Sequence, residues 1–180
     1  MPLPQAWILD VGCGTGSWIR QMLDWGASPE HVFGVDLLPE RIAQARKLTA
    51  SRVQFECSSA HELHFEDGRF DLLIQSAVFT SVLDPKLKSL IAREMLRILR
   101  PKGIVLWYDF FLNNPFNPNV HGVGKREIEK LFPNCRISLE RITLAPPIAR
   151  TVSPVSSSMY RLLSSLKVLC THYLGVIQPM

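Results

Sequence analysis

Three glycines that follow an acid in an apolar run constrain this chain more than any other sequence feature. A short apolar run contains Asp10 and leads directly into Gly12, Gly14 and Gly16. Glycine allows the backbone to turn sharply and lets a ligand approach the main chain closely. A second apolar run ends at Asp36, about 20 residues beyond the third glycine, which is the spacing of a nucleotide-binding βαβ unit. The segment therefore predicts a strand, a ligand-binding turn, a helix and a second strand.

The spacing of the glycines distinguishes two kinds of nucleotide site. A dinucleotide site has the pattern Gly-x-Gly-x-x-Gly, whereas this chain has Ser17 at the place of the third glycine. The acid Asp10 at the mouth of the loop would repel a pyrophosphate, but it suits a ligand with a cationic amino group. A dehydrogenase is therefore disfavoured. The second acid, Asp36, is placed to accept hydrogen bonds from both hydroxyls of a ribose.

Length and composition describe one ordinary globular domain. The chain has 180 residues, and its 47% of hydrophobic residues suffices for a full core. The four cysteines are scattered without a Cys-x-x-Cys pair, which argues against a zinc site or a disulfide framework. The sequence has no uninterrupted apolar stretch of about 18 residues, so we expect no transmembrane helix. The segment before the first strand, Met1–Gln5, is too short and uncharged for a signal peptide. We expect a cytoplasmic protein with reduced thiols.

Strand and helix patterns alternate along the chain, which is typical of a parallel α/β sheet. We expect strands at 6–11, 31–35, 53–56, 70–75, 103–110, 136–144 and 173–177. We expect helices at 18–25, 39–48, 85–99, 125–132 and 157–170, and an irregular link at 145–154. The last helix has an apolar stripe opposite Arg161 and Lys167, which favours a core-facing helix. Contact with a membrane surface or a second copy is the alternative for that stripe.

The segment Asp10–Gly16 (Asp-Val-Gly-Cys-Gly-Thr-Gly) resembles the first motif of the class I S-adenosylmethionine (SAM) dependent methyltransferases that act on small molecules. Asp36–Arg46 resembles the family's second motif, Phe70–Ile74 its fourth strand, and Leu99–Gly103 its turn into the fifth strand. The resemblance implies an α/β fold with one doubly wound, seven-stranded sheet, mostly parallel with an antiparallel last strand. It also implies SAM as methyl donor, S-adenosylhomocysteine as product and no metal.

The same resemblance implies roles for individual residues. Asp10 would orient the methionine amino group, Asp36 would bind the ribose, and Leu37 would pack on the adenine. Family members often have an acid that accepts from the adenine amino group, where this chain has Ser59. Adenine recognition is therefore expected to rest on the Ser59 hydroxyl and the Ala60 backbone N–H. The residues implied in cofactor binding are Asp10, Gly12, Cys13, Gly14, Gly16, Asp36, Leu37, Ser59, Ala60 and Gln75.

Gln75 ends the expected fourth strand, where it would line the floor beneath the methionine chain of SAM. A nucleic-acid amino methyltransferase would have Asn- or Asp-Pro-Pro-aromatic at this point, and this chain has Gln75 to Val78 (Gln-Ser-Ala-Val). A metal-dependent catechol-type enzyme would have an acid there. Both classes are therefore disfavoured.

The whole chain, 1–180, is expected to form a single methyltransferase domain. The stretches 111–124 and 145–170 are expected as an acceptor-side loop and a helical insertion. Relatives usually carry one or two helices before the first strand, which here begins about six residues into the sequence. Three interpretations of this early first strand are open: the site is uncovered, another subunit covers it, or truncation has removed the lid helices.

A general base is required if the acceptor is an alcohol, because a neutral hydroxyl is a poor nucleophile. His121 and Asp109 are the candidates, since both lie at or after the end of the fifth strand, where open α/β sheets bind ligands. The alternative role for Asp109 is a cap on the loop backbone. The loop suits a polyhydroxyl acceptor because it is rich in asparagine, at Asn113, Asn114, Asn117 and Asn119.

The predicted function is methyl transfer from SAM to a small polar acceptor, with a hydroxyl of a sugar, glycan or natural-product intermediate as first choice. A non-catalytic SAM-binding subunit that needs a partner and an N-methyltransferase are the alternatives. The positive charge between Lys125 and Lys167 indicates a solvated surface or a patch for an anionic substrate such as a sugar phosphate. Nucleic acid is not expected as a partner, and a homodimer stays open.

Overall fold

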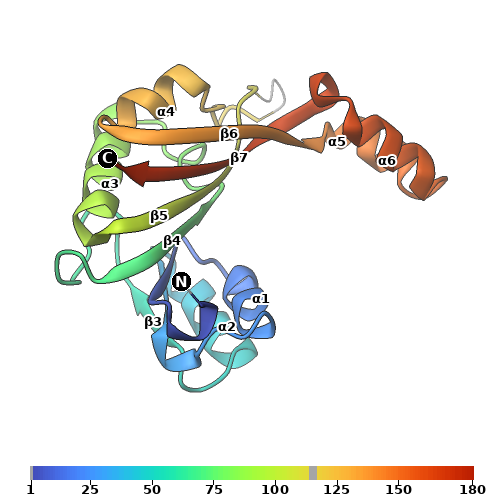
Figure 1. The fold of residues 1–180 in the computed structure, drawn as a ribbon. Coiled ribbons are helices and arrows are strands. Elements are labelled where there is room, and N and C mark those ends of the chain that lie inside the picture. Colours follow the sequence, from blue (N-terminus) through green and yellow to red (C-terminus); the bar gives the residue numbers. More distant parts are fainter. Residues whose placement is uncertain (1, 114–116) are drawn as a thin grey trace.

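The computed structural model describes residues 2–113 and 117–180, and it places one mixed sheet between two layers of helices (Figure 1). The strands are β1 (Ile8–Val11), β2 (Val32–Asp36), β3 (Gln54–Cys57), β4 (Phe70–Ser76), β5 (Leu99–Phe110), β6 (Cys135–Leu144) and β7 (Cys170–Pro179). The helices are α1 (Ser17–Asp24), α2 (Pro39–Leu48), α3 (Pro85–Ile98), α4 (Lys125–Leu131), α5 (Pro146–Val152) and α6 (Ser157–Ser165). Short 3₁₀ turns are η1 (Leu3–Gln5), η2 (Pro29–His31) and η3 (Lys167–Leu169).

The sheet has the order β3-β2-β1-β4-β5-β7-β6. The strands β1 to β5 all run parallel to one another, and β7 is antiparallel to both β5 and β6. This arrangement confirms the expected seven-stranded sheet with an antiparallel last strand. The order reverses between β1 and β4, so the loops after these two strands diverge and leave a place for a ligand at the carboxyl edge.

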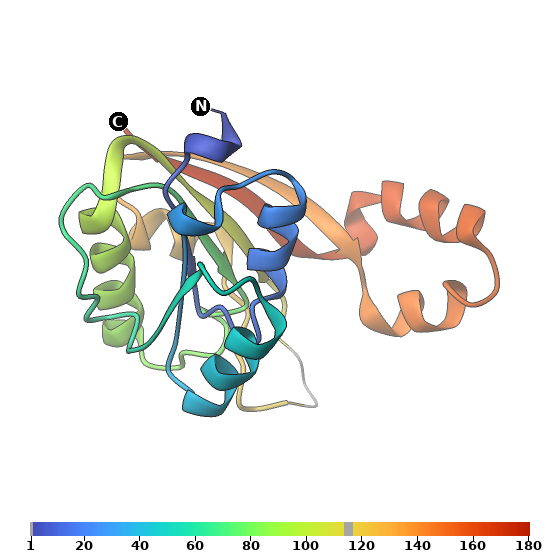
Figure 2. The same ribbon diagram turned by 90° about the horizontal axis from the view of Figure 1, so that it is seen from below.

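The alternation of side chains along β1 divides the core between the two faces of the sheet. Ile8 packs in a cluster with Ile19 of α1 and Ala45 of α2, whereas Leu9 belongs to the cluster that contains Met95 of α3 and Ile128 of α4. Figure 2 shows these helices on opposite sides of the sheet. Every residue of β1 and β2 is buried because both faces are covered.

The segment between β6 and β7 differs from the sequence-based expectation. Residues 145–154, expected as an irregular link, contain the helix α5, because Pro146 and Pro147 occupy its first turn, where an intrahelical N–H is not required. The helix expected at 157–170 ends at Ser165 and is followed by η3. None of the residues of α6, all of which the structure describes, is buried. The expectation of a core-facing helix is therefore wrong.

We call residues 145–169, which include α5, α6 and η3, the helical arm. Figures 1 and 2 both show it projecting from the end of the β6–β7 ribbon, away from the two helical layers. Within the arm α5 packs against α6, and both helices contact the end of β6. Because the arm projects away from the two helical layers, they do not cover its apolar side chains, and these stay exposed.

Gly34, in the middle of β2, leaves no room for a side chain. A Cβ there would lie 2.6 Å from Ile19 Cδ1, 2.9 Å from Cys13 Sγ and 2.9 Å from Phe55 Cδ1. We expect Gly34→Ala to lower the free energy of unfolding by about 1–3 kcal/mol, because overpacking would push α1 and the glycine loop from β2. Urea unfolding measures the change. Gly124→Ala is the matched control, since nothing lies within 4 Å of its Cβ position. Equal stability of the two variants would contradict this account.

Candidate functional site

The glycine loop joins β1 to α1 and has the backbone conformation that the sequence predicts. Gly12, Gly14 and Gly16 have φ values of 72°, 54° and 78°, in the left-handed region that favours glycine. A Cβ on Gly12 would also overlap the Cγ2 methyl of Val78, in the loop after β4. Both conformation and space therefore require glycine at this position.

Hydrogen bonds hold the glycine loop against the end of β2. The backbone N–H groups of Gly12 and Cys13 both donate to the carbonyl oxygen of Val35 at 2.8 Å. The N–H of Gly14 donates to Oδ2 of Asp36 at 2.8 Å, and the N–H of Leu38 donates to Oδ1 at 3.0 Å. The structure thus brings together the glycine loop and the second acid, which the sequence analysis placed at one site.

Asp10 has an unusual environment for a carboxylate. It is only 1% exposed, and neither oxygen has a hydrogen-bond partner among the described residues. Burial, and secondly the charge of Asp36, raises the pKa of Asp10 to about 7. A buried carboxylate without a partner is unfavourable, and a cationic group bound beside it would remove that penalty. This is the property expected of a residue that binds an ammonium group.

The backbone N–H of Cys13 holds the glycine loop on β2, whereas its thiol is unreactive. Its side chain is buried beneath the loop, and burial together with the charges of Asp10 and Asp36 raises the pKa of the thiol. The thiol therefore stays protonated at neutral pH, and its weak donor contact goes to the carbonyl oxygen of Gly14 at 3.7 Å. Cys13 is not a reactive cysteine.

The residues expected around an adenine lie beside the end of β2. Leu37, next to Asp36, is 67% exposed. The N–H of Ser58 donates to the carbonyl oxygen of Asp36 at 3.2 Å, so the stretch with Ser59 and Ala60 lies at the same edge. The Ser59 hydroxyl is in hydrogen-bond contact with Nδ1 of His61 at 2.6 Å.

Gln75, expected beneath the methionine chain of SAM, is buried near the carboxyl end of β4. It pairs with Val11 in the register of β1 and β4, and it is fully buried. Its Oε1 accepts from the N–H of Val78 at 3.3 Å, while its Nε2 has no partner among the described residues. The amide oxygen therefore fixes the loop after β4, while the two N–H donors of Nε2 stay unused at the strand position that pairs with Val11, one residue before the glycine loop.

Asp109, a candidate base, holds two loops together. It is buried at the end of β5, and its oxygens accept from the hydroxyl and the N–H of Thr80 at 2.6 and 3.2 Å and from the N–H of Phe110 at 3.1 Å. Burial raises its pKa to about 6, although the hydrogen bonds from Thr80 oppose the shift. These contacts match the capping role that the sequence left open for it.

His121, the other candidate base, is exposed and lies against the same loop. Its backbone N–H donates to the carbonyl oxygen of Thr80 at 2.9 Å. Asn113 accepts from the N–H of Gly122 at 2.9 Å, which stabilises the base of the 111–124 loop. Asn114 lies outside the described residues. The loops after β4 and β5 therefore meet beside the glycine loop.

Val78 and Thr80 belong to the site and were missed by the sequence analysis. Val78 limits the space at Gly12, and Thr80 is the partner of Asp109. Their position directly after a strand was a signal, because ligands bind at that edge. In a loop, however, no periodicity indicates which side chain points inward.

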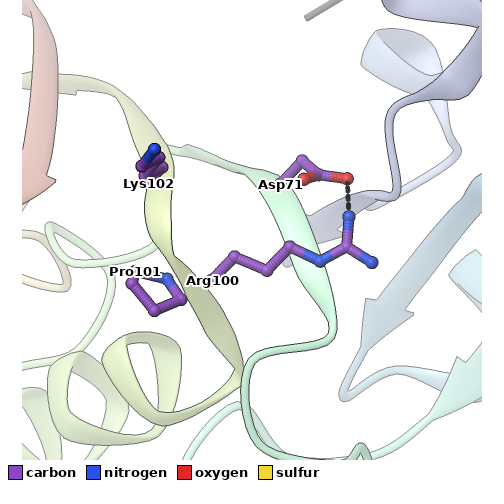
Figure 3. A pocket seen from close by; sticks show the side chains of 4 residues that line it. All are labelled: Asp71, Arg100, Pro101 and Lys102. Carbon is purple, nitrogen blue, oxygen red and sulfur yellow. Dashed lines mark hydrogen bonds and ion pairs between the residues drawn. The ribbon is translucent and has the colours of Figure 1, made fainter.

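A shallow pocket lies at the opposite, amino edge of the sheet (Figure 3). Asp71, Arg100, Pro101 and Lys102 line it. Asp71 accepts from Arg100 at 2.5 Å and from the N–H of Trp7 at 3.0 Å, so its carboxylate joins β4 to β5 and to the residue before β1. This pocket is separate from the glycine loop, and its acid has a structural role.

Within residues 2–113 and 117–180 no cluster of three or more His, Cys, Asp or Glu side chains is arranged to hold a metal ion. In the same ranges no helix has the length and apolar character needed to cross a membrane.

The sheet order, the glycine loop and the two acids at the carboxyl edge are those of the class I SAM-dependent methyltransferase fold. The model of the methyltransferase domain family matches residues 8–103, and the chain belongs to this family. It shares the fold of a SAM-dependent methyltransferase from Methanosarcina mazei, with a TM-score of 0.70, 20% identity, and coverage of 98% of this chain and 94% of that one.

Curated relatives also match at the sequence level, and two of them illustrate the coverage. The 2-methyl-6-phytyl-1,4-hydroquinone methyltransferase of Synechocystis is 33% identical over 110 residues, which are 59% of this chain and 33% of the relative. An uncharacterized 37.1 kDa protein in transposon Tn4556 of Streptomyces fradiae is 34% identical over 159 residues, 83% of this chain and 45% of the relative. The chain thus spans less than half the length of these relatives.

The raised pKa of Asp10 makes the stability of the free protein depend on pH. Between about pH 4 and pH 7 the unfolded chain has released this proton while the folded chain still holds it, so stability falls as pH rises. We expect Asp10→Asn to lack this loss. The difference in free energy of unfolding between wild type and variant should therefore change by roughly 2–4 kcal/mol between about pH 4 and pH 7. Urea unfolding at several pH values measures it. The exposed Asp24→Asn is the control, and a pH-independent difference for Asp10→Asn would refute the assignment.

Proposed function

We propose that this chain transfers a methyl group from SAM to a hydroxyl of a small polar acceptor. The observation that carries the proposal is the buried, unpartnered carboxylate of Asp10 at the mouth of the glycine loop. SAM supplies a methyl group activated by a sulfonium, together with an amino group and a ribose. The residues present fit these groups, because an ammonium would satisfy Asp10 and the ribose hydroxyls would reach Asp36.

The protein's own contribution to this reaction is the positioning of the two reactants. The N–H groups of the glycine loop and the carboxylate of Asp36 lie within one hydrogen-bonded unit, which holds a nucleoside in a fixed orientation. Leu37 offers its exposed side chain to the flat face of an adenine. Holding donor and acceptor in line supplies much of the rate enhancement of a displacement reaction.

His121 is our first candidate for the general base, and Asp109 is the second. His121 is exposed on a loop that contacts the loop after β4, so its imidazole is accessible to an acceptor proton. Asp109 is buried with three donors on its carboxylate, which supports a role in positioning Thr80.

The acceptor class rests on the amides of the 111–124 loop, which suit a sugar, glycan or natural-product hydroxyl. The Synechocystis relative is named for a hydroquinone acceptor, which also supports a small organic molecule. The alternative is an N-methyltransferase, which would need a neutral amine as acceptor and no general base. The variants of His121 and Asp109 described below distinguish it from an O-methyltransferase. A SAM-binding subunit without turnover is the remaining alternative, and methyl transfer to any acceptor would exclude it.

We expect Asp36→Ala to weaken the binding of SAM and S-adenosylhomocysteine by roughly 10- to 100-fold, because hydrogen bonds to a charged group contribute about 1.5–3 kcal/mol. Isothermal titration calorimetry on the purified chain measures the affinity. Asp24→Ala is the control, since Asp24 is an exposed acid on α1. Unchanged affinity in Asp36→Ala would show that the nucleoside binds elsewhere.

We expect His121→Gln to lower kcat on a hydroxyl acceptor by about 10²- to 10⁴-fold while the affinity for SAM is retained. The acceptor comes from a panel of nucleotide sugars, glycolipid precursors, phenols and amines, assayed by formation of S-adenosylhomocysteine. His64→Gln is the control, because His64 pairs with Glu56 at 2.8 Å on the exposed surface of the chain.

The role of Asp109 is resolved by comparing two variants. If Asp109 positions the loop, Asp109→Asn and Thr80→Val lower stability and kcat together. If it is the base, only Asp109→Asn lowers kcat strongly, and the pH profile of kcat loses its acidic limb. Retention of kcat in His121→Gln would exclude His121.

A further inference from the structure

The excess positive charge of the chain lies entirely in its last 40 residues. The first 140 residues contain 16 basic and 16 acidic side chains, and Glu140 is the last acid in the sequence. The remaining residues contain no acid and the four basic side chains Arg141, Arg150, Arg161 and Lys167. Lys167 pairs with Glu140 at 2.6 Å, whereas Arg150 and Arg161 are exposed on the helical arm. The arm is therefore a cationic projection from a chain that is otherwise balanced in charge.

The same arm exposes several large apolar side chains. Val155 is 83% exposed, Leu162 63% and Val168 78%, and Met159 and Leu166 are about half exposed. Met159 and Leu162 lie on one side of α6 by their spacing, Arg161 lies on the other side, and Leu166 follows the end of the helix. An amphipathic helix with an aliphatic face and basic residues is typical of proteins that lie in a membrane interface.

The arm projects from the edge of the sheet that carries the candidate site. β6 runs in the same direction as β1 and ends at Leu144, and the antiparallel β7 begins at Cys170. Both ends are therefore at the carboxyl edge, where β1 leads into the glycine loop (Figures 1 and 2). A surface that binds the arm would therefore face the same edge as the loops after β4 and β5.

We propose that the helical arm docks this protein on an anionic lipid surface. The aliphatic side chains enter the boundary between headgroups and acyl chains, and the exposed arginines are attracted by anionic headgroups. A second copy of the chain fits this face less well, because two arms in contact would bring like charges together without acids to oppose them. The docking does not depend on the methyl transfer. An acceptor drawn from the bilayer surface would rest on the proposed function.

Vesicle flotation with the purified chain tests the docking. The probes are vesicles of phosphatidylcholine alone and vesicles that contain roughly 30% phosphatidylglycerol, which gives a negative surface potential. We expect the chain to float with the anionic vesicles and to remain at the bottom with the neutral ones. Raising the salt from about 0.1 M to about 1 M is expected to weaken binding, because it screens the headgroup charge.

Two double variants separate the apolar and the charged contributions. Val155→Ser with Leu162→Ser removes aliphatic area, and Arg150→Gln with Arg161→Gln removes charge. Each is expected to lower partition into anionic vesicles by roughly tenfold or more, since a basic residue near such a surface contributes about 1 kcal/mol. The matched controls are Trp25→Ser, which removes a side chain 59% exposed elsewhere, and Arg126→Gln with Lys130→Gln on α4. The controls are expected to bind as wild type does.

Three results would overturn the docking proposal: no flotation with anionic vesicles, equal binding by the arm variants and the wild type, or dimerisation in analytical ultracentrifugation that the Val155→Ser and Leu162→Ser pair abolishes. The last would assign the face to a second copy. Calorimetry with SAM on the same preparation keeps the two proposals distinct. Flotation without SAM binding would overturn the proposed function alone, and SAM binding without flotation would overturn the docking alone.

Discussion

The close packing of the glycine loop between β2 and the loop after β4 is the constraint on which the rest of the structure depends. Two backbone N–H groups converge on the carbonyl oxygen of Val35, and Val78 occupies the space that a side chain at Gly12 would need. This packing fixes the positions of β1, β2 and β4 relative to one another. It also buries Asp10, because the loop closes over the end of the strand that carries it.

The two acids of the site have opposite environments, although both follow from the same fold. Asp36 lies at a strand end where backbone N–H groups of Gly14 and Leu38 satisfy its oxygens. Asp10 lies within a strand, where the neighbouring N–H groups are used in the sheet and none reaches its carboxylate. A folded chain can retain such a group at a cost in stability when a ligand supplies the missing charge. The proposed function gives these two acids different parts of one ligand, the amino group for Asp10 and the ribose for Asp36.

Sequence reasoning predicted the first half of the fold well because the signals there are local. The helix at 39–48 has the expected bounds, since Pro39 marks its first turn. The role of Asp109 stayed open because its partner Thr80 lies 29 residues earlier in the chain, and no local pattern reports such a contact. The helical arm was misassigned for a related reason. Periodicity identifies which residues of α6 share a face, but only the tertiary structure determines whether that face is covered.

The burial of Cys13 has a consequence for the chemical durability of the site. Oxidants and alkylating agents attack the thiolate, and access and ionisation together decide which cysteines react. Cys13 lies under the glycine loop beside two carboxylates that disfavour its ionised form. The exposed Cys57, by contrast, lies at the end of β3, and its thiol donates to the carbonyl oxygen of Leu37 at 3.5 Å. Oxidants would therefore reach Cys57, next to the residues expected around an adenine, before they reached Cys13 beneath the glycine loop. Any redox sensitivity of this edge of the sheet would then come from β3 and not from the turn after β1.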